Sequence, residues 1–388
     1  MFFIKKNEKR TEFDQSKWDA DHGNTSAMYH TGMLYFFGRG VEKDPIKALY
    51  YFHMGAEKND TQSILMMAQC YENGMCDIKI DNQTAFGFYK KAADLGDTFA
   101  LTKIINFYLN GIYIDKNEEK AYEYCKKLAN LSSVKDIREL GNSYYEGTND
   151  PKTLKLALLY FTVAADLGDA ESMFYAGYNY YCGEGTELNY QKAVEYFKEA
   201  ANLGQARAMG FLGLCYENGN GVTADSKKSI EFYQQASDCG DEQATYNLGL
   251  CYYYGRNSLD KNIEKGLALF TKAVDMDNLP AMRELGNIYY YGIGIEKDID
   301  KGLQLLEKAA ENGECNAMYT LGCHYYFGEN GEADKNKAFI YFEKSANLGN
   351  IGSTHNLAVC YQNGEGTEKN QAKADELFKK EEELKSNK

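Results

Sequence analysis

The stretch AESMFYAGYNYYCGEGTELNYQKAVEYFKEAANLGQ, residues 170–205, is one complete copy of a pattern that recurs along the chain. Its first half places apolar and small residues at helical spacing and ends at Gly183. Its second half does the same and ends at Gly204. Apolar residues at i, i+3, i+4 and i+7 predict two amphipathic helices, here called helix A and helix B, joined by a loop.

A Tyr followed three residues later by Gly occurs ten times, at spacings of 36 or 37 residues. These repeat tyrosines are Tyr35, Tyr71, Tyr108, Tyr144, Tyr180, Tyr216, Tyr252, Tyr289, Tyr325 and Tyr361. A fixed period of this length marks a repeat architecture, and such units stack because one alone cannot bury its apolar face. The sequence therefore predicts an all-α solenoid of about ten helix-turn-helix repeats.

Helix B has a start signal in every repeat. Asp or Asn precedes it in nine repeats, and Thr153 takes this place in the remaining one. The nine are Asp44, Asp81, Asn117, Asn189, Asp225, Asn262, Asp298, Asp334 and Asn370. Such side chains accept hydrogen bonds from the free amides of a helix start, so we expect them to be N-caps.

Small residues recur three positions before the repeat Tyr, with Ile105 as the exception. Most of them are Gly, which costs about 1 kcal/mol relative to Ala in a helix interior. Recurrence at one register therefore predicts a close crossing of helices A and B. We expect the repeat Tyr itself to be a packing residue and not a catalytic one.

Charge and composition exclude several classes of function. The chain has 43 basic and 57 acidic residues, a net charge of −14, and no run of Lys and Arg. This argues against a nucleic-acid or anionic-membrane surface, both of which need clustered positive charge. No secretory signal or membrane span is evident, so we expect a cytoplasmic protein without membrane insertion.

The ten cysteines suggest neither disulfides nor a metal site. Cys70, Cys215, Cys251 and Cys360 share one register, immediately before the repeat Tyr. Equivalent positions in adjacent repeats lie too far apart for a disulfide. No Cys-x-x-Cys pair occurs, so we predict buried thiols and neither a metal nor a cofactor.

The pattern Leu-Gly-x-x-Tyr-x-x-Gly, then Asp or Asn, then Lys-Ala and Ala-Ala-x-x-Gly, resembles the Sel-one-like repeat, a relative of the tetratricopeptide repeat. Its residues are exemplified by Leu248, Gly249, Tyr252 and Gly255 in the first half, and Lys192, Ala193, Ala200, Ala201 and Gly204 in the second. The resemblance implies a right-handed α/α superhelix whose A helices line a concave groove. It also implies an adaptor for other proteins, as in signalling, membrane-protein degradation and host–pathogen contacts.

We expect three parts in the chain. Residues 1–23 form an N-terminal tail and a half-repeat capping helix, in which Trp18 covers the first core. Residues 24–380 form ten repeats in one solenoid, and residues 381–388 form a polar C-terminal end. A polar outer face is what a terminal repeat needs to prevent further stacking.

Three functions stay open at this point. The favoured one is a non-enzymatic adaptor that binds a protein or peptide in the groove. The second is a structural or oligomerising module, because the sequence does not set the oligomeric state. The third and most remote is an enzyme resembling a β-lactam hydrolase, although the chain has no phosphate-binding loop, metal cluster or evident Ser/His/Asp constellation.

Analogy with tetratricopeptide repeats predicts which residues face the groove: the two after each repeat Tyr, and those two and six before it. Aromatic residues at these positions concentrate in repeats seven to nine, and such residues often dominate interface energies. The predicted partner-binding set is Tyr178, Tyr181, Tyr246, Tyr253, Tyr254, Arg283, Asn287, Tyr290, Tyr291, Tyr319, Tyr326 and Phe327. For the residue directly after the repeat Tyr, packing against the following repeat is an equal alternative.

Overall fold

The computed structural model describes residues 11–328, 331 and 333–386, and within them every regular element is an α-helix. The predicted all-α class is confirmed. The chain divides into two compact units, Met1–Ala200 and Ala201–Lys388, which are described separately. Most of the predicted N-terminal tail, residues 1–10, and the last two residues of the polar end lie outside the described residues.

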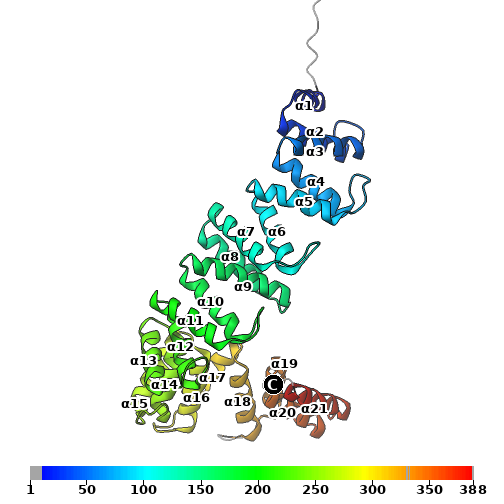
Figure 1. The fold of residues 1–388 in the computed structure, drawn as a ribbon. Helices are drawn as coiled ribbons and strands as arrows, with labels where there is room; N and C mark the ends of the chain where they lie inside the picture. Colours follow the sequence, from blue (N-terminus) through cyan, green and yellow to red (C-terminus); the bar gives the residue numbers. More distant parts are fainter. Residues whose placement is uncertain (1–10, 329–330, 332, 387–388) are drawn as a thin grey trace, which may run out of the picture. The chain divides into compact units, whose positions relative to one another are not determined.

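The first unit starts with a single helix, α1, and continues with helix pairs that follow one another along the chain (Figure 1). Each pair is one repeat, with an even-numbered helix A and an odd-numbered helix B. The helices are α1 (Glu12–Asp21), α2 (Thr25–Phe37), α3 (Pro45–Glu57), α4 (Thr61–Asn73), α5 (Asn82–Asp94), α6 (Thr98–Asn110), α7 (Glu118–Leu131), α8 (Val134–Tyr145), α9 (Pro151–Asp166), α10 (Ala170–Cys182) and α11 (Tyr190–Asn202).

The second unit continues the same alternation, beginning with helix A of repeat six. Its helices are α12 (Ala206–Asn218), α13 (Ser226–Asp238), α14 (Glu242–Tyr254), α15 (Ile263–Asp275), α16 (Leu279–Tyr291), α17 (Ile299–Glu311), α18 (Cys315–Phe327), α19 (Lys335–Asn347), α20 (Ile351–Asn363) and α21 (Gln371–Ser386). The last helix thus includes residues 381–386, and Glu381 in it is buried and bonded to His355 Nδ1 at 2.9 Å.

The nine predicted Asp and Asn caps of helix B are confirmed. Asp44 is typical, because its Oδ1 accepts the backbone N–H of Lys47 at 2.9 Å. The other eight accept a backbone N–H in the same way. Helix A is capped as well, for example by Asp60 and Asp97, and it usually ends at the Gly of the repeat, which adopts a left-handed conformation.

The cap predicted for repeat four is wrong. Helix α9 begins at Pro151, and its cap is Asp150, whose carboxylate accepts the backbone N–H of Thr153 at 3.0 Å. Asp followed by Pro is a stronger start than Thr, because Pro at the first helical position is already fixed near the helical φ. The loop before α9 therefore spans only residues 146–150, whereas the corresponding loop of repeat five spans residues 183–189.

The predicted close crossing of helices A and B is confirmed. Gly32, Gly141, Gly177, Gly213, Gly249 and Gly322 each face an aromatic ring of the following helix B, and an added Cβ would lie 2.5–2.7 Å from a ring atom. Real Cβ atoms do not approach that closely, so each ring occupies the space that the missing side chain leaves. In these six repeats, Gly at this register is required by packing.

The repeat Tyr is a packing residue, as predicted. Tyr325 stacks on Tyr341 of the same repeat with ring centroids 5.8 Å apart, and the Lys337 ammonium lies 4.9 Å from its centroid. Tyr180 is held in the same way between Tyr196 and Lys192. Stacking and cation–π contacts therefore join the two helices within a repeat.

Helix α1 lies in the segment where we expect a half-repeat cap, but Trp18 does not cover the core. The Trp18 side chain is 44% exposed, and its ring stacks on His22 at 3.9 Å. The covering residues are Phe13, which packs edge-on against Tyr35, and the fully buried Ala20. The helical register explains this difference, because Trp18 follows Phe13 by five residues and so falls on another face.

Candidate partner-binding surface

In three successive repeats, the second residue after the repeat Tyr ends helix A and is exposed. In repeats seven, eight and nine these residues are Tyr254, Tyr291 and Phe327, with exposed fractions of 43%, 48% and 67%. Three successive A helices thus each present a large aromatic side chain at the same register. A single exposed aromatic needs no explanation, but a row at a fixed position is a candidate contact surface.

The first residue after the repeat Tyr is buried in repeats seven and eight. Tyr253 is 1% exposed, and its hydroxyl donates to the carbonyl oxygen of Ile293 in the next repeat at 2.6 Å. Tyr290 is 3% exposed and stacks on His324 at 3.7 Å. The expectation that these two residues face a partner is corrected, because each packs against the following repeat.

The remaining predicted residues differ in their surroundings. Tyr246 is buried against Phe270, so it also belongs to the core. Tyr326 is half-buried and donates its hydroxyl to Glu365 of the next repeat. Tyr178 and Tyr181 are half-buried residues of the first unit and are packed near Phe174 and Tyr190, respectively.

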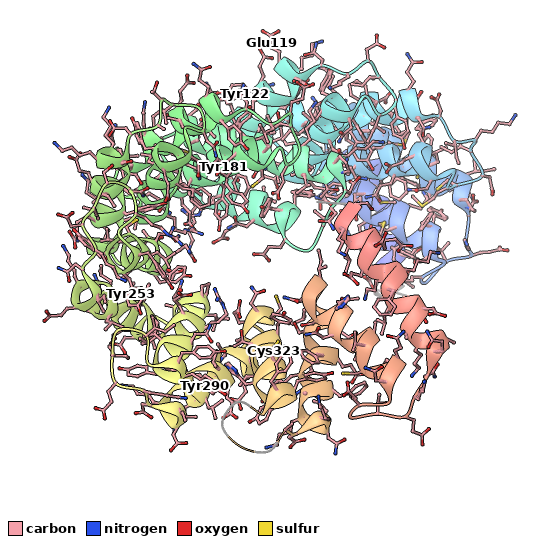
Figure 2. The ribbon with its side chains drawn as sticks, turned by 90° about the horizontal axis from the view of Figure 1, so that it is seen from below. Glu119, Tyr122, Tyr181, Tyr253, Tyr290 and Cys323 are labelled. Atoms are coloured by element: carbon pink, nitrogen blue, oxygen red, sulfur yellow. The ribbon has the colours of Figure 1, made fainter. Side chains whose placement is uncertain are left out.

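Four predicted residues line one cavity of about 390 Å³ in the second unit. These are Tyr254, Asn287, Tyr291 and Tyr319. The other lining residues are Glu284, Ile288, Ile293, Thr320, Cys323 and His324. Figure 2 labels Tyr253, Tyr290 and Cys323 on the successive helices α14, α16 and α18 that contribute to this region. Phe327 and Arg283 are outside the lining.

The polar groups of this cavity are centred on Glu284. The Tyr254 hydroxyl donates to its carboxylate, and Arg283 Nη1 lies 3.6 Å from its Oε2. Arg283 is shared, because its Nε lies 3.7 Å from Glu314. Burial, followed by the bond to Glu284, raises the pKa of Tyr254 well above its ordinary value, so the phenol is a neutral donor at physiological pH.

Glu284, Cys323 and His324 were missed by sequence reasoning. His324 occupies the slot directly before the repeat Tyr, which holds Cys in four other repeats. Its ring lies between the aromatic pair of the preceding repeat, with Tyr291 at 5.4 Å in an edge-on arrangement. His324 is the one titratable base in this slot, and that difference was the signal that could have found this site.

A second cavity, of about 820 Å³, lies in the first unit against α9. Its lining comes from the loops of repeats three and five and from the start of α9, and it includes Lys116, Glu118, Lys155 and Gly185. Glu118 lies 2.8 Å from the Lys116 ammonium and 2.5 Å from that of Lys155. The Glu118 carboxylate is thus already paired with two Lys, so the cavity is a weaker candidate for a partner site than the aromatic one.

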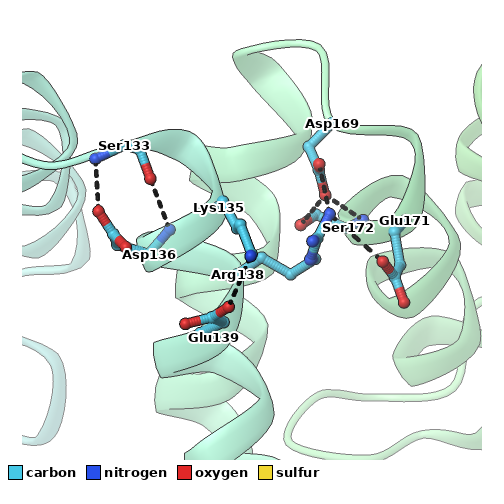
Figure 3. Close-up of polar contacts among 8 residues, drawn as sticks. All are labelled: Ser133, Lys135, Asp136, Arg138, Glu139, Asp169, Glu171 and Ser172. Carbon is cyan, nitrogen blue, oxygen red and sulfur yellow. Dashed lines mark hydrogen bonds and ion pairs between the residues drawn. The ribbon is translucent and has the colours of Figure 1, made fainter.

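Polar contacts around Arg138 are structural (Figure 3). Arg138 Nη1 lies 2.8 Å from Asp169 and 3.3 Å from Glu171. Asp169 also caps α10 by accepting the backbone N–H of Ser172 at 2.9 Å. The cluster therefore attaches the start of repeat five to helix A of repeat four.

Across residues 11–328, 331 and 333–386, no three His, Cys, Asp or Glu side chains are grouped as metal ligands would be. Over the same residues, no helix combines the length and apolar character that crossing a bilayer requires.

Repeated helix pairs, with a small residue at the crossing in nine of the ten repeats, define a helical-repeat solenoid protein. The Sel1 repeat matches ten segments of this chain, at residues 25–60, 61–97, 106–133, 137–169, 170–205, 206–241, 242–278, 279–314, 315–350 and 353–380. The chain belongs to the Sel1 repeat family. The resemblance drawn from the sequence is therefore confirmed.

Two curated relatives share short stretches with the chain. HRD3A, an ERAD-associated E3 ubiquitin-protein ligase component of Arabidopsis thaliana, is 34% identical over 68 residues, which are 17% of this chain and 10% of the relative. Chitin synthase regulatory factor 2 of Schizosaccharomyces pombe is 30% identical over 99 residues, which are 24% of this chain and 19% of the relative. The matches thus span less than a fifth of either relative.

Two solved structures are similar over much of the chain. A protective antigen of uropathogenic Escherichia coli with an SLR fold is 26% identical, with a TM-score of 0.51, over 96% of this chain and 79% of the antigen. A Sel1 repeat protein from Oxalobacter formigenes has a TM-score of 0.57 and 23% identity over 66% of this chain and 100% of its own. At 23% identity, the similarity to the Oxalobacter formigenes protein shows a shared fold alone.

Proposed function

We propose that the chain is a non-enzymatic adaptor that binds a protein or peptide partner on the A-helix face of repeats seven to nine. The observation that carries this proposal is the row of Tyr254, Tyr291 and Phe327, exposed at one register on successive A helices. Aromatic side chains give large contact areas at low rotamer cost and often dominate binding energies. The ten repeats are proposed to form one solenoid whose concave groove contains this row.

The relatives support a role through other proteins. One is a ligase component and the other a regulatory factor, and the match to each falls in a short shared stretch. For the compartment we propose the cytoplasm. The buried thiols of Cys70 and Cys76 form a hydrogen bond at 3.7 Å and no disulfide, an arrangement that persists in a reducing environment.

The test uses partners found by proximity labelling in the native cell, followed by mass spectrometry. The combined variant Tyr254→Ala, Tyr291→Ala and Phe327→Ala is expected to lose these partners while its circular dichroism spectrum is unchanged. Phe37→Ala is the matched control, because Phe37 is exposed at the same register in repeat one. Unchanged capture by the combined variant contradicts the proposal.

The same variant also tests the alternative that the chain is an oligomerising module. Light scattering after size-exclusion chromatography gives the mass of the wild-type protein and of the combined variant. A wild-type oligomer that becomes a monomer in the variant would assign this surface to self-association.

A further inference from the structure

The cavity of repeats seven to nine combines ring faces with hydrogen-bond acceptors. Tyr254, Tyr291 and Tyr319 come from three successive A helices and contribute aromatic rings to its wall. Glu284 contributes a carboxylate, and the buried Oδ1 of Asn287 accepts no hydrogen bond within the protein.

The charge of the wall is negative. Among the described residues that line the cavity, Glu284 is the carboxylate and none is Lys or Arg. Arg283 lies next to Glu284 but also pairs with Glu314, so its charge is divided between two carboxylates. An anionic group would meet the Glu284 carboxylate, and a purely apolar group would remove that carboxylate from water without supplying a further donor.

A cation is attracted both by the aromatic rings of the wall and by its negative charge. Ring faces attract Lys and Arg through the aromatic quadrupole, and the attraction grows as water is removed. Tyr254 already has such a contact, because the Arg256 guanidinium lies 5.0 Å from its ring centroid. The Glu284 carboxylate would supply the complementary charge, as in bidentate Arg–carboxylate pairs.

We infer that this cavity receives a basic side chain, Arg or Lys, from the bound partner. The inference rests on the proposed function and names the chemistry of the segment that the adaptor recognises. The net charge of the whole chain, −14, favours the same kind of partner. A volume of about 390 Å³ accommodates a guanidinium or ammonium group with its aliphatic stem.

The test compares two pools of fluorescein-labelled peptides of one length. The flanking positions are random in both pools, and the central residue is arginine in one and citrulline in the other. Citrulline has almost the shape of arginine but no charge. Fluorescence anisotropy should show about tenfold tighter binding of the arginine pool, the size of one partly desolvated cation–π contact with its ion pair.

Glu284→Gln should reduce this preference to less than about threefold, because the amide keeps the shape and an acceptor for Tyr254 but loses the charge. The matched control is Glu307→Gln, since Glu307 also accepts a Tyr hydroxyl, that of Tyr325 at 3.3 Å, but does not line the cavity. The control should keep the full preference.

Equal binding of the two pools, or no measurable binding of either, overturns the inference. A preference for arginine that Glu284→Gln leaves unchanged also overturns it, because the cation is then bound elsewhere. These outcomes are distinct from failure of the proposed function, which shows itself as unchanged partner capture by the combined Tyr254, Tyr291 and Phe327 variant.

Discussion

At the residue scale, the absence of a side chain at Gly allows the two helices of a repeat to pack closely. Gly322 on α18 faces the Phe342 ring, and an added Cβ would lie 2.6 Å from it. Gly322→Ala is expected to destabilise the second unit by about 1–3 kcal/mol through overpacking, reduced by the roughly 1 kcal/mol that Ala gains in helix propensity. The measurement is the urea midpoint followed by circular dichroism.

Gly87 is the matched control for this substitution. It lies inside α5, and an added Cβ would meet nothing within 4 Å. Gly87→Ala should therefore raise the urea midpoint, by about 0.4–1 kcal/mol in stability. A lower midpoint for Gly87→Ala, or an unchanged one for Gly322→Ala, would contradict the packing account.

Adjacent residues of the same type show where sequence reasoning reaches its limit. The sequence places both Tyr253 and Tyr254 at groove positions, but the first is buried and the second exposed. The difference depends on the next repeat, because the carbonyl oxygen of Ile293 meets the Tyr253 hydroxyl. Contacts within one repeat can be predicted from the spacing of its apolar residues. Contacts between repeats also depend on the conformations of the loops, which this spacing does not predict.

Among the elements, α9 shows how a local signal changes a helix boundary. Asp150→Ala should destabilise the first unit by about 0.5–2 kcal/mol, because the carboxylate caps α9. Thr153→Ala should have a smaller effect, since Thr153 lies inside the first turn. Urea midpoints of the two variants measure the difference. A larger loss of stability in Thr153→Ala than in Asp150→Ala would show that Thr153 is the cap of α9, as the sequence predicted.

The start of α7 is attached to α9 by charge, because Lys155 lies 2.5 Å from Glu118. Lys116 and Lys155 lower the pKa of Glu118 to about 2. A lowered carboxyl pKa means that the contacts stabilise the fold above the unfolded pKa, and that this contribution is lost as pH falls from about 4.5 towards 2. Lys155→Met should raise the pKa of Glu118 towards its ordinary value, as measured by carbon-13 NMR of the carboxyl group.

Lys135→Met is the control for this titration. Lys135 pairs with Glu139 at 3.6 Å on the exposed side of α8. The pKa of Glu118 should not change in this variant. A Glu118 pKa that stays near 2 in Lys155→Met would show that Lys116 alone holds the carboxylate.

At the scale of the whole molecule, the regular features of the chain were predictable and the irregular ones were not. Ten copies of one Tyr-x-x-Gly pattern define the helix pairs, and nine of ten helix-B caps lie where the pattern places them. Both cavities contain residues that differ between repeats. Pro151 and Lys155 of α9 line one, and His324 lines the other, in a slot that holds Cys in four repeats.

The net charge of the molecule predicts how binding depends on salt. With 57 acidic and 43 basic residues, the chain attracts a basic partner over several ångströms before contact. Raising the salt from about 0.01 M to about 1 M shortens the screening length from roughly 30 Å to roughly 3 Å. The association rate constant should fall at least about tenfold, because steering is lost.

The dissociation rate constant should change less, since the aromatic contacts are short-range. Biolayer interferometry with a captured partner measures both constants. The combined Tyr254, Tyr291 and Phe327 variant should behave in the opposite way, with faster dissociation at every salt concentration. An association rate constant independent of salt would mean that the acidity serves solubility and does not guide the partner.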